Sequence, residues 1–198
     1  MKNKLLLDAF FYLGVPLLMW NLFRESLGDY HTILYGMLPA VIYTIVVAFI
    51  NKEWNVTGIF FISIISMNFL FNLLSKTAEQ ELWNGVYMSV ISFSFYVLTI
   101  VIKKPIGMYF FIDYAFAKGI PRKVSKELYS SSNNFHYFVE FTLFLMVREV
   151  VVGAIKSFLI FNKGVSAFNT IQITSSVLEY VFTGLTVFYV IYILKKIK

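Results

Sequence analysis

Six apolar segments, each long enough to cross a lipid bilayer as a helix, constrain this chain more than any other feature. A hydrocarbon core of about 30 Å requires about 20 consecutive apolar residues in a helix. Windows of about that length find segments near 5–23, 31–50, 57–75, 84–102, 136–160 and 174–194. We therefore predict an all-α fold, in which residues 1–198 form a single membrane domain of six transmembrane helices.

The overall composition supports the same class of protein. Hydrophobic side chains make up 59% of the chain and charged side chains 14%, whereas a soluble domain has about 45–50% apolar and about 25% charged residues. So few charged residues do not cover the surface of a soluble domain of this length. The chain is predicted to be a polytopic integral membrane protein.

The distribution of Lys and Arg predicts the orientation of the segments. If the first segment starts on the cytoplasmic side, 12 of the 17 basic residues lie in the cytoplasm, three lie outside, and Arg148 and Lys156 lie within the fifth segment. Because basic loops are retained in the cytoplasm, both termini are predicted to be cytoplasmic. Lys2 and Lys4 before an apolar run resemble a signal peptide, but Asp8 and the lack of a small-residue cleavage site favour an uncleaved helix.

The long connection over residues 103–135 carries most of the cytoplasmic charge. Apolar residues from Met108 to Phe116 recur at helical spacing between basic residues. This pattern favours a helix in the membrane interface, attracted to anionic headgroups by about 1 kcal/mol per Lys or Arg; a solvated basic loop is the alternative. Residues 121–134, rich in Ser and Asn, are predicted to be a flexible linker. The residues assigned to the lipid interface are Lys103, Lys104, Lys118, Arg122, Lys123 and Lys126.

The fifth segment contains four charged residues, two acidic and two basic. A charge at the centre of a bilayer costs roughly 2.5–3.5 kcal/mol, so such residues normally face protein or water and are candidates for function. Steps of about 100° per residue place Glu149 and Lys156 within about 20° on one helix face, two turns apart. This geometry favours pairing between them over pairing between Glu140 and Arg148.

Polar residues of neighbouring segments fall at a similar predicted depth. Glu179 enters the sixth segment at the depth of Lys156, and Asn68 and Asn72 lie one turn apart in the third. One interpretation is an interhelical network, in which such side chains contribute about 0.6–2 kcal/mol each. The other is a binding site in the outer half of the bundle. The predicted cluster consists of Asn68, Asn72, Arg148, Glu149, Lys156 and Glu179.

Several functions are excluded by what the sequence lacks. Without Cys there are no disulfides and no thiolate ligands, and His31 and His136 are predicted at opposite sides of the membrane, where they cannot share a metal. Common zinc, phosphate-binding, dinucleotide-binding and serine-nucleophile motifs are missing. We predict no catalytic residues, no metal, no cofactor and no enzymatic activity. Because orientation accounts for the net charge of +6, no nucleic-acid partner is predicted.

Short motifs resemble a known family. They are Gly-Val-Pro-Leu-Leu at 14–18, Leu-Pro at 38–39, Val-Ile-Lys-Lys-Pro-Ile-Gly-Met-Tyr at 101–109 and Phe-Ala-Lys-Gly at 116–119. In these motifs and in the order of its segments, the chain resembles a family of uncharacterised small bacterial inner-membrane proteins that is itself similar to intracellular septation protein A. The resemblance implies a bacterial cytoplasmic membrane protein with several spans and an envelope or division role, and it implies no catalytic residues.

Two functions from different classes follow. In the first, the protein binds or transports a small solute or ion through an outer-half polar cavity, where Arg148 and Lys156 hold an anionic group and Glu149 or Glu179 is a coupling carboxylate. In the second, which the resemblance favours, it is a non-enzymatic envelope or cell-division scaffold whose basic face recruits partners or lipid. The bilayer and its anionic headgroups are predicted partners in both, and a homo-oligomer is compatible with either.

Overall fold

The computed structural model describes residues 7, 10–51 and 56–197, and this part of the chain is 92% helical without strands. An all-α fold is therefore confirmed. Lys2, Lys4 and Lys52, which contribute to the predicted orientation, lie outside the described residues. The elements in order are the π-helical turn η1 (Phe10–Gly14), α2 (Val15–Asn51), α3 (Val56–Leu74), α4 (Ala78–Val101), α5 (Ile106–Ala117), α6 (Arg122–Tyr129), α7 (Ser132–Lys163), the 3-10 turn η2 (Gly164–Ala167) and α8 (Phe168–Lys196).

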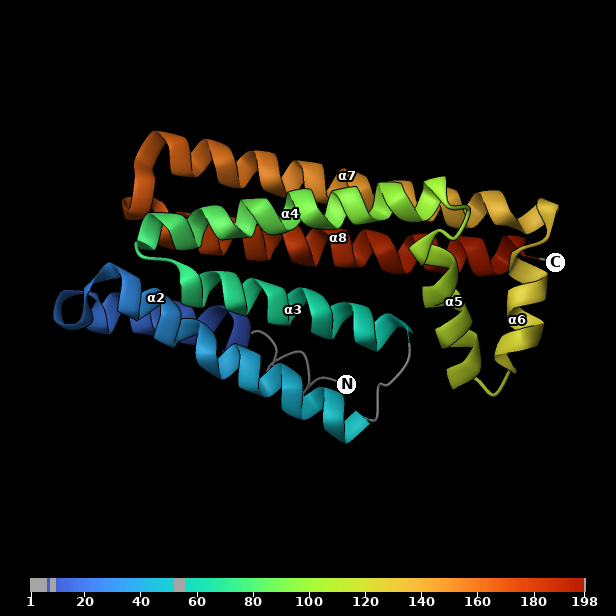
Figure 1. Cartoon of the computed structure of the whole chain (residues 1–198), viewed down its shortest axis with the longest axis horizontal. Helices are drawn as coiled ribbons and strands as arrows, with labels where there is room; N and C mark the ends of the chain where they lie inside the picture. Colours follow the sequence, from blue (N-terminus) through green and yellow to red (C-terminus); the bar gives the residue numbers. More distant parts are fainter. Residues whose placement is uncertain (1–6, 8–9, 52–55, 198) are drawn as a thin grey trace.

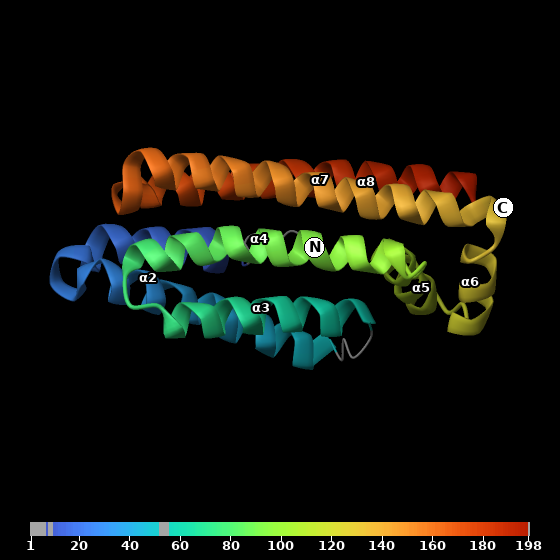
Figure 2. The ribbon, with the colours of Figure 1, turned by 45° about the horizontal axis from the view of Figure 1, so that its top comes forward.

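The long helices form an elongated bundle. Figures 1 and 2 show α3, α4, α7 and α8 running along the long axis, while the short helices α5 and α6 lie across one end. The hairpin of α7 and α8 is closed at the opposite end by η2. Among the described residues, three helical stretches are long and apolar enough to cross a membrane: Val56–Leu74, Ala78–Val101 and Ser132–Lys196, the last of which contains both α7 and α8.

The helix α2 folds back on itself at Gly28. This residue has φ 76° and ψ 162°, a conformation that a side chain would strain and that glycine adopts readily. The two arms then pack against each other: the rings of Phe11 and Tyr43 stack with centroids 4.5 Å apart. A Cβ atom at Gly36 would lie 3.4 Å from the Cα of Pro16. The first and second predicted segments are thus the two arms of one helical hairpin.

Large apolar side chains cover much of the outside of the bundle. Phe161 is 85% exposed and Phe188 is 75% exposed, and many Leu, Ile and Val residues accompany them. Soluble monomers rarely expose contiguous apolar surface on this scale. The outer surface therefore has the character of a surface that contacts lipid.

Residues 121–134 are not a flexible linker, so that prediction was wrong. They form α6 and the first turn of α7. Pro121 precedes the first residue of α6, where its fixed φ suits a helix start. The Ser and Asn side chains then bond to the carbonyls that end α6: Ser130 Oγ donates to Lys126 O at 2.6 Å, and Asn134 Nδ2 donates to Leu128 O at 3.0 Å. The polar run therefore makes a tight turn between helices.

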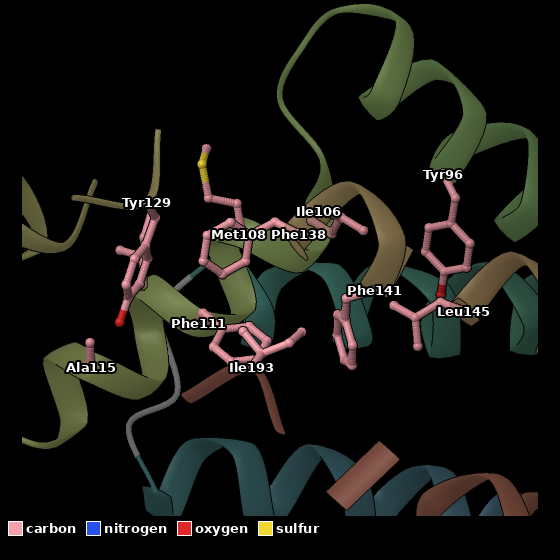
Figure 3. Close-up of a cluster of buried hydrophobic side chains, with 11 residues drawn as sticks. Tyr96, Ile106, Met108, Phe111, Ala115, Tyr129, Phe138, Phe141, Leu145 and Ile193 are labelled. Carbon is pink, nitrogen blue, oxygen red and sulfur yellow. The ribbon is translucent and has the colours of Figure 1, made fainter. Parts of the chain in front are cut away.

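The helix α5 forms where helical spacing predicted it, but its apolar residues face the protein. Met108, Phe111 and Ala115 are each 3% exposed and pack with Phe138 and Ile193, which are fully buried. Figure 3 shows these side chains converging from α5, α7 and α8. The apolar spacing in α5 therefore serves the core of this end of the molecule, which differs from the expectation that it faces the membrane interface.

Two polar contacts fix α5 to the long helices. The buried carboxylate of Asp113 accepts hydrogen bonds from Thr57 N at 2.9 Å and Thr57 Oγ1 at 2.8 Å, which satisfies the first turn of α3, and it pairs with Arg122 at 3.2 Å. At the start of α5, Gly107 N donates to Thr142 Oγ1 at 3.1 Å. A Cβ atom at Gly107 would lie 2.8 Å from a ring carbon of Phe141, so this approach requires glycine.

Candidate functional site

Arg148 is the centre of an ion-pair network between α7 and α8. Its guanidinium lies 3.5 Å from Glu149 Oε1 and 3.0 Å from Glu179 Oε2. The predicted pairing of Glu149 with Lys156 is not formed within the described part of the chain. The reason is that a helical-wheel angle ignores side-chain reach, and the forked guanidinium of Arg148 bonds two carboxylates at once. The fourth charge of the segment, Glu140, accepts a hydrogen bond from Tyr189 OH at 3.3 Å.

Asn72 belongs to a buried network that joins three helices. Its Nδ2 lies 2.9 Å from Met37 Sδ in α2, and its Oδ1 accepts from Asn84 Nδ2 in α4 at 2.8 Å. Asn84 also donates to Ser75 Oγ at 2.7 Å. Because Asn72 is only 1% exposed and both ends of its amide have partners, its geometry is that of an interhelical link. Asn84 was missed in the sequence, where nothing in its own helix marks it.

A cavity of about 410 Å³ lies between η1, α2, α3, α7 and α8. Four residues of the predicted cluster line it, and these are Asn68, Asn72, Lys156 and Glu179. Arg148 and Glu149 do not line it, although Arg148 pairs with Glu179. The structure thus divides the predicted cluster into a cavity wall and an adjoining ion-pair network.

One wall of the cavity is a polar stripe on α8. Its members recur at helical spacing, i, i+3, i+4, i+7 and i+11, and therefore share one face of the helix. Sequence reasoning identified only one of them, although the spacing was present in the sequence. Gln172 Nε2 donates to Tyr12 O at 2.8 Å and holds η1 against α8, while the hydroxyl groups of Tyr12 and Thr44 hydrogen-bond across the α2 hairpin. The stripe consists of Gln172, Ser175, Ser176, Glu179 and Thr183.

Apolar side chains from η1, α2 and α3 also line the cavity. Leu13 and Pro16 come from η1 and α2, Val41 comes from the second arm of α2, and Ile65 and Phe69 come from α3. The cavity therefore combines hydrogen-bonding groups, including Asn68 and Asn72 of α3, with hydrocarbon side chains. Such a site can bind a molecule with one polar and one apolar part.

Lys156 reaches the cavity past a glycine of α4. A Cβ atom at Gly85 would lie 3.6 Å from Lys156 Nζ and 3.9 Å from its Cδ, so the lysine chain lies directly over the position that lacks a side chain. Lys156 is half-buried and makes no hydrogen bond or ion pair with any described residue. In contrast, Glu179 already pairs with Arg148. The unpaired charge on the cavity wall is therefore positive.

The six residues assigned to the lipid interface lie at the end of the bundle that carries α5 and α6, and all six are exposed. Arg122 pairs with Asp113 and covers the ring of Phe116 at 4.4 Å. The other five form no ion pair with described residues. This end of the molecule therefore offers free positive charge to solvent or to headgroups.

In the part of the chain that the structure describes, no three His, Asp or Glu side chains gather where they could hold a metal ion. Comparison of the chain with known proteins gave no matching family model, no matching curated protein and no matching solved structure.

Proposed function

We propose that this chain is a bacterial inner-membrane protein that crosses the membrane six times, with both termini in the cytoplasm, and that it binds or transports a small solute or ion through the cavity. The six crossings are the two arms of α2 together with α3, α4, α7 and α8. Their common direction along the bundle and the apolar outer surface support this topology. The basic residues at the α5–α6 end support a cytoplasmic position for that end.

The topology has a direct test because the chain contains no Cys. Single cysteines at Ser166 in η2 and at Ser130 after α6 are both exposed and lie at opposite ends of the bundle. In intact cells, we expect an impermeant thiol reagent to label the Ser166→Cys variant and not the Ser130→Cys variant. Labelling of the Ser130→Cys variant alone would reverse the proposed orientation.

The observation that carries the proposed function is a cavity of ligand-binding size that contains an unpaired cation. Binding pockets for small molecules typically occupy about 300–1,000 Å³, and this cavity of about 410 Å³ lies within that range. A charged side chain inside a membrane bundle is costly and is usually retained for function. A helix bundle with a purely structural role requires neither a cavity of this size nor a charged side chain on its wall.

The geometry changes the roles expected for the charged residues. Lys156 is the cationic group that contacts the solute, because it lines the cavity and has no ion-pair partner among the residues that the structure describes. Arg148 instead holds Glu179 in position on the wall. Glu179 is the candidate coupling carboxylate, since it alone both lines the cavity and belongs to the ion-pair network.

A second candidate function is an envelope or division scaffold that binds lipid or partners through the α5–α6 end. Its support is a surface on which exposed basic residues alternate with exposed apolar ones. Phe116 is 52% exposed, Ile120 44% and Val124 54%, and they lie among Lys118, Lys123 and Lys126. This mixture suits the boundary between headgroups and acyl chains. The family resemblance favours this function, whereas the cavity favours the first.

Filling the cavity tests the first function. We expect Ser176→Trp to place an indole in the cavity, and Ser94→Trp to place one on the exposed side of α4 as a matched control. Both variants and the native protein would be reconstituted in nanodiscs and heated with a panel of small solutes. A solute that binds the cavity should raise the unfolding temperature of the native protein and of Ser94→Trp, but not of Ser176→Trp. Equal stabilisation of all three, or of none, would contradict the proposal.

A further inference from the structure

We infer that the ligand of the cavity is an organic anion with an apolar body, whose carboxylate or phosphate group meets Lys156 and whose hydrocarbon part lies against α2 and α3. This inference rests on the proposed function and specifies the chemical class of its solute. It follows from three features of the cavity: its charge, its hydrogen-bond donors and its apolar side chains.

The first feature is the charge on the cavity wall. Lys156 has no ion-pair partner among the described residues, and the negative charge of Glu179 is met by Arg148 at 3.0 Å. Glu149 and Glu179 are the acidic neighbours of Lys156, but both carboxylates contact Arg148 instead. An anion that enters the cavity therefore finds an ammonium group whose donors are free, whereas a cation finds a carboxylate that already contacts Arg148. Because an unpaired ammonium in an apolar medium is costly, the ligand that supplies its missing partner is anionic.

The second feature is the supply of hydrogen-bond donors beside Lys156. Ser175 and Ser176 line the cavity, and neither hydroxyl bonds to another described residue. A hydroxyl can donate to a carboxylate or phosphate oxygen, and an ammonium can donate three such bonds. Lys156 and these two serines together offer the donors that the oxygens of an acidic group accept.

The third feature is the apolar part of the cavity wall, to which Leu13, Pro16, Val41, Ile65 and Phe69 contribute beside the polar Asn68 and Asn72. A small inorganic anion would leave this wall in contact with water. A ligand with a hydrocarbon part removes the wall from water as it binds, which favours binding in proportion to the apolar area covered. The ligand is therefore amphipathic rather than a free inorganic ion.

Gly85 determines where the positive charge lies. The nearest atoms to a Cβ built at this position belong to the flexible end of Lys156, so a large side chain there would displace the ammonium while leaving the charge in the protein. Gly184, in α8, has open space around its Cβ position. Gly85→Leu therefore tests the position of the ammonium group while Lys156 keeps its charge, and Gly184→Leu is the matched control that leaves the ammonium group in place.

The experiment uses four probes and the full chain in nanodiscs of zwitterionic lipid. The probes are 3-phenylpropanoate, the isosteric alcohol 3-phenylpropan-1-ol, 3-phenylpropylammonium and inorganic phosphate. We expect the carboxylate to bind at least about tenfold more tightly than each of the others. Lys156→Met and Gly85→Leu should each weaken the carboxylate at least about tenfold, while Lys156→Arg and Gly184→Leu should retain binding; a tenfold change corresponds to about 1.4 kcal/mol.

Each alternative result overturns a stated part of the inference. If the alcohol binds as tightly as the carboxylate, or if Lys156→Met binds the carboxylate as the native protein does, the ligand need not be an anion. The cavity would still be a solute-binding site. If inorganic phosphate binds as tightly as 3-phenylpropanoate, the ligand does not need an apolar body. If the carboxylate does not bind, but another solute binds the native protein and not Ser176→Trp, the inference fails and the proposed function survives. If the binding of no solute depends on the cavity, both fail. Competition by hexadecanoate placed in the bilayer distinguishes a membrane-borne acid from a soluble one, and the inference holds with either source.

Discussion

Two regions of this molecule, the α5–α6 end and the cavity, differ in whether their polar side chains have hydrogen-bond or ion-pair partners. At the α5–α6 end, the carboxylate of Asp113 receives hydrogen bonds from Thr57 and an ion pair from Arg122, and the surrounding core is fully closed at Phe138 and Ile193. At the cavity, Lys156 and the serine hydroxyls of α8 have no partners among the described residues. An apolar medium penalises unsatisfied polar groups. The satisfied contacts of the α5–α6 end therefore favour stability, and the unsatisfied groups of the cavity support the proposed binding of a ligand.

The Arg148 network lies beside the cavity and contrasts with Lys156 on the same helix. Replacing Arg148 with Met should leave the carboxylates of Glu149 and Glu179 without their cation, and we expect a loss of about 3 kcal/mol in the free energy of unfolding. The loss would be measured as a lower unfolding temperature of the purified protein. Adding Glu179→Gln should recover part of it, because fewer uncompensated charges then remain.

Lys156→Met is the control for that prediction. Removal of Lys156 breaks no ion pair with a described residue and removes an ammonium group that is costly in an apolar medium, so we expect no loss of stability and a higher unfolding temperature. If the two substitutions destabilise the protein equally, the contrast between a paired and an unpaired cation is incorrect.

Gly107→Ala tests how tightly the α5–α6 end is closed. The added methyl group would lie 2.8 Å from Phe141 Cδ1 and 3.0 Å from the backbone oxygen of Phe138, and overpacking of this kind costs about 1–3 kcal/mol. Gly184→Ala, which meets open space in α8, should be neutral or slightly stabilising because alanine favours helix. Thermal unfolding of both variants measures the difference, and equal stability would mean that this end is not closely packed.

The sequence predicted the long helices well because hydropathy alone determines them. The predicted segments 57–75 and 84–102 correspond to α3 and α4, and the break between the first two segments falls where Gly28 reverses α2. The helix α6 was not predicted, because the Ser-Asn run that follows it, residues 130–134, led to the whole segment being interpreted as a linker, and Ser and Asn are as common in linkers as in capped turns. Only their bonds to the carbonyls of Lys126 and Leu128 distinguish the two.

The candidate site was predictable in its residue types but not in its pairing. Asn68, Asn72, Lys156 and Glu179 do line one cavity, because spacing and depth along a helix can be read from sequence. The ion-pair partner of Glu149 could not be read from the sequence, because it depends on how far each side chain reaches. The space that Gly85 leaves for Lys156 depends on how α4 and α7 pack, which no pattern within one helix encodes.

The basic residues of the α5–α6 end can be tested against a basic residue at the opposite end. Replacing Lys123 with Gln should weaken the binding of phosphatidylglycerol by about 1 kcal/mol at low salt, which is roughly fivefold. Lys163→Gln, at the η2 end of the bundle, is the matched control and should leave binding unchanged. Native mass spectrometry of the protein with bound lipid measures both, and equal losses would show that lipid does not prefer the α5–α6 end.

The smallest effect that we expect concerns Tyr129, the last residue of α6, which is 6% exposed. Burial raises the pKa of its phenol, and the neighbouring Tyr114 raises it further. The folded protein therefore holds this proton more tightly than the unfolded chain does. The resulting stability is fully present below the ordinary phenol pKa of about 10 and is lost as the pH rises through the higher pKa of the folded state. Tyr129→Phe removes the group that titrates, so its unfolding temperature should fall less than that of the native protein between pH 9 and pH 11. Identical pH profiles would show that the α5–α6 end opens to water before Tyr129 loses its proton, and that this end is less firmly closed than its core suggests.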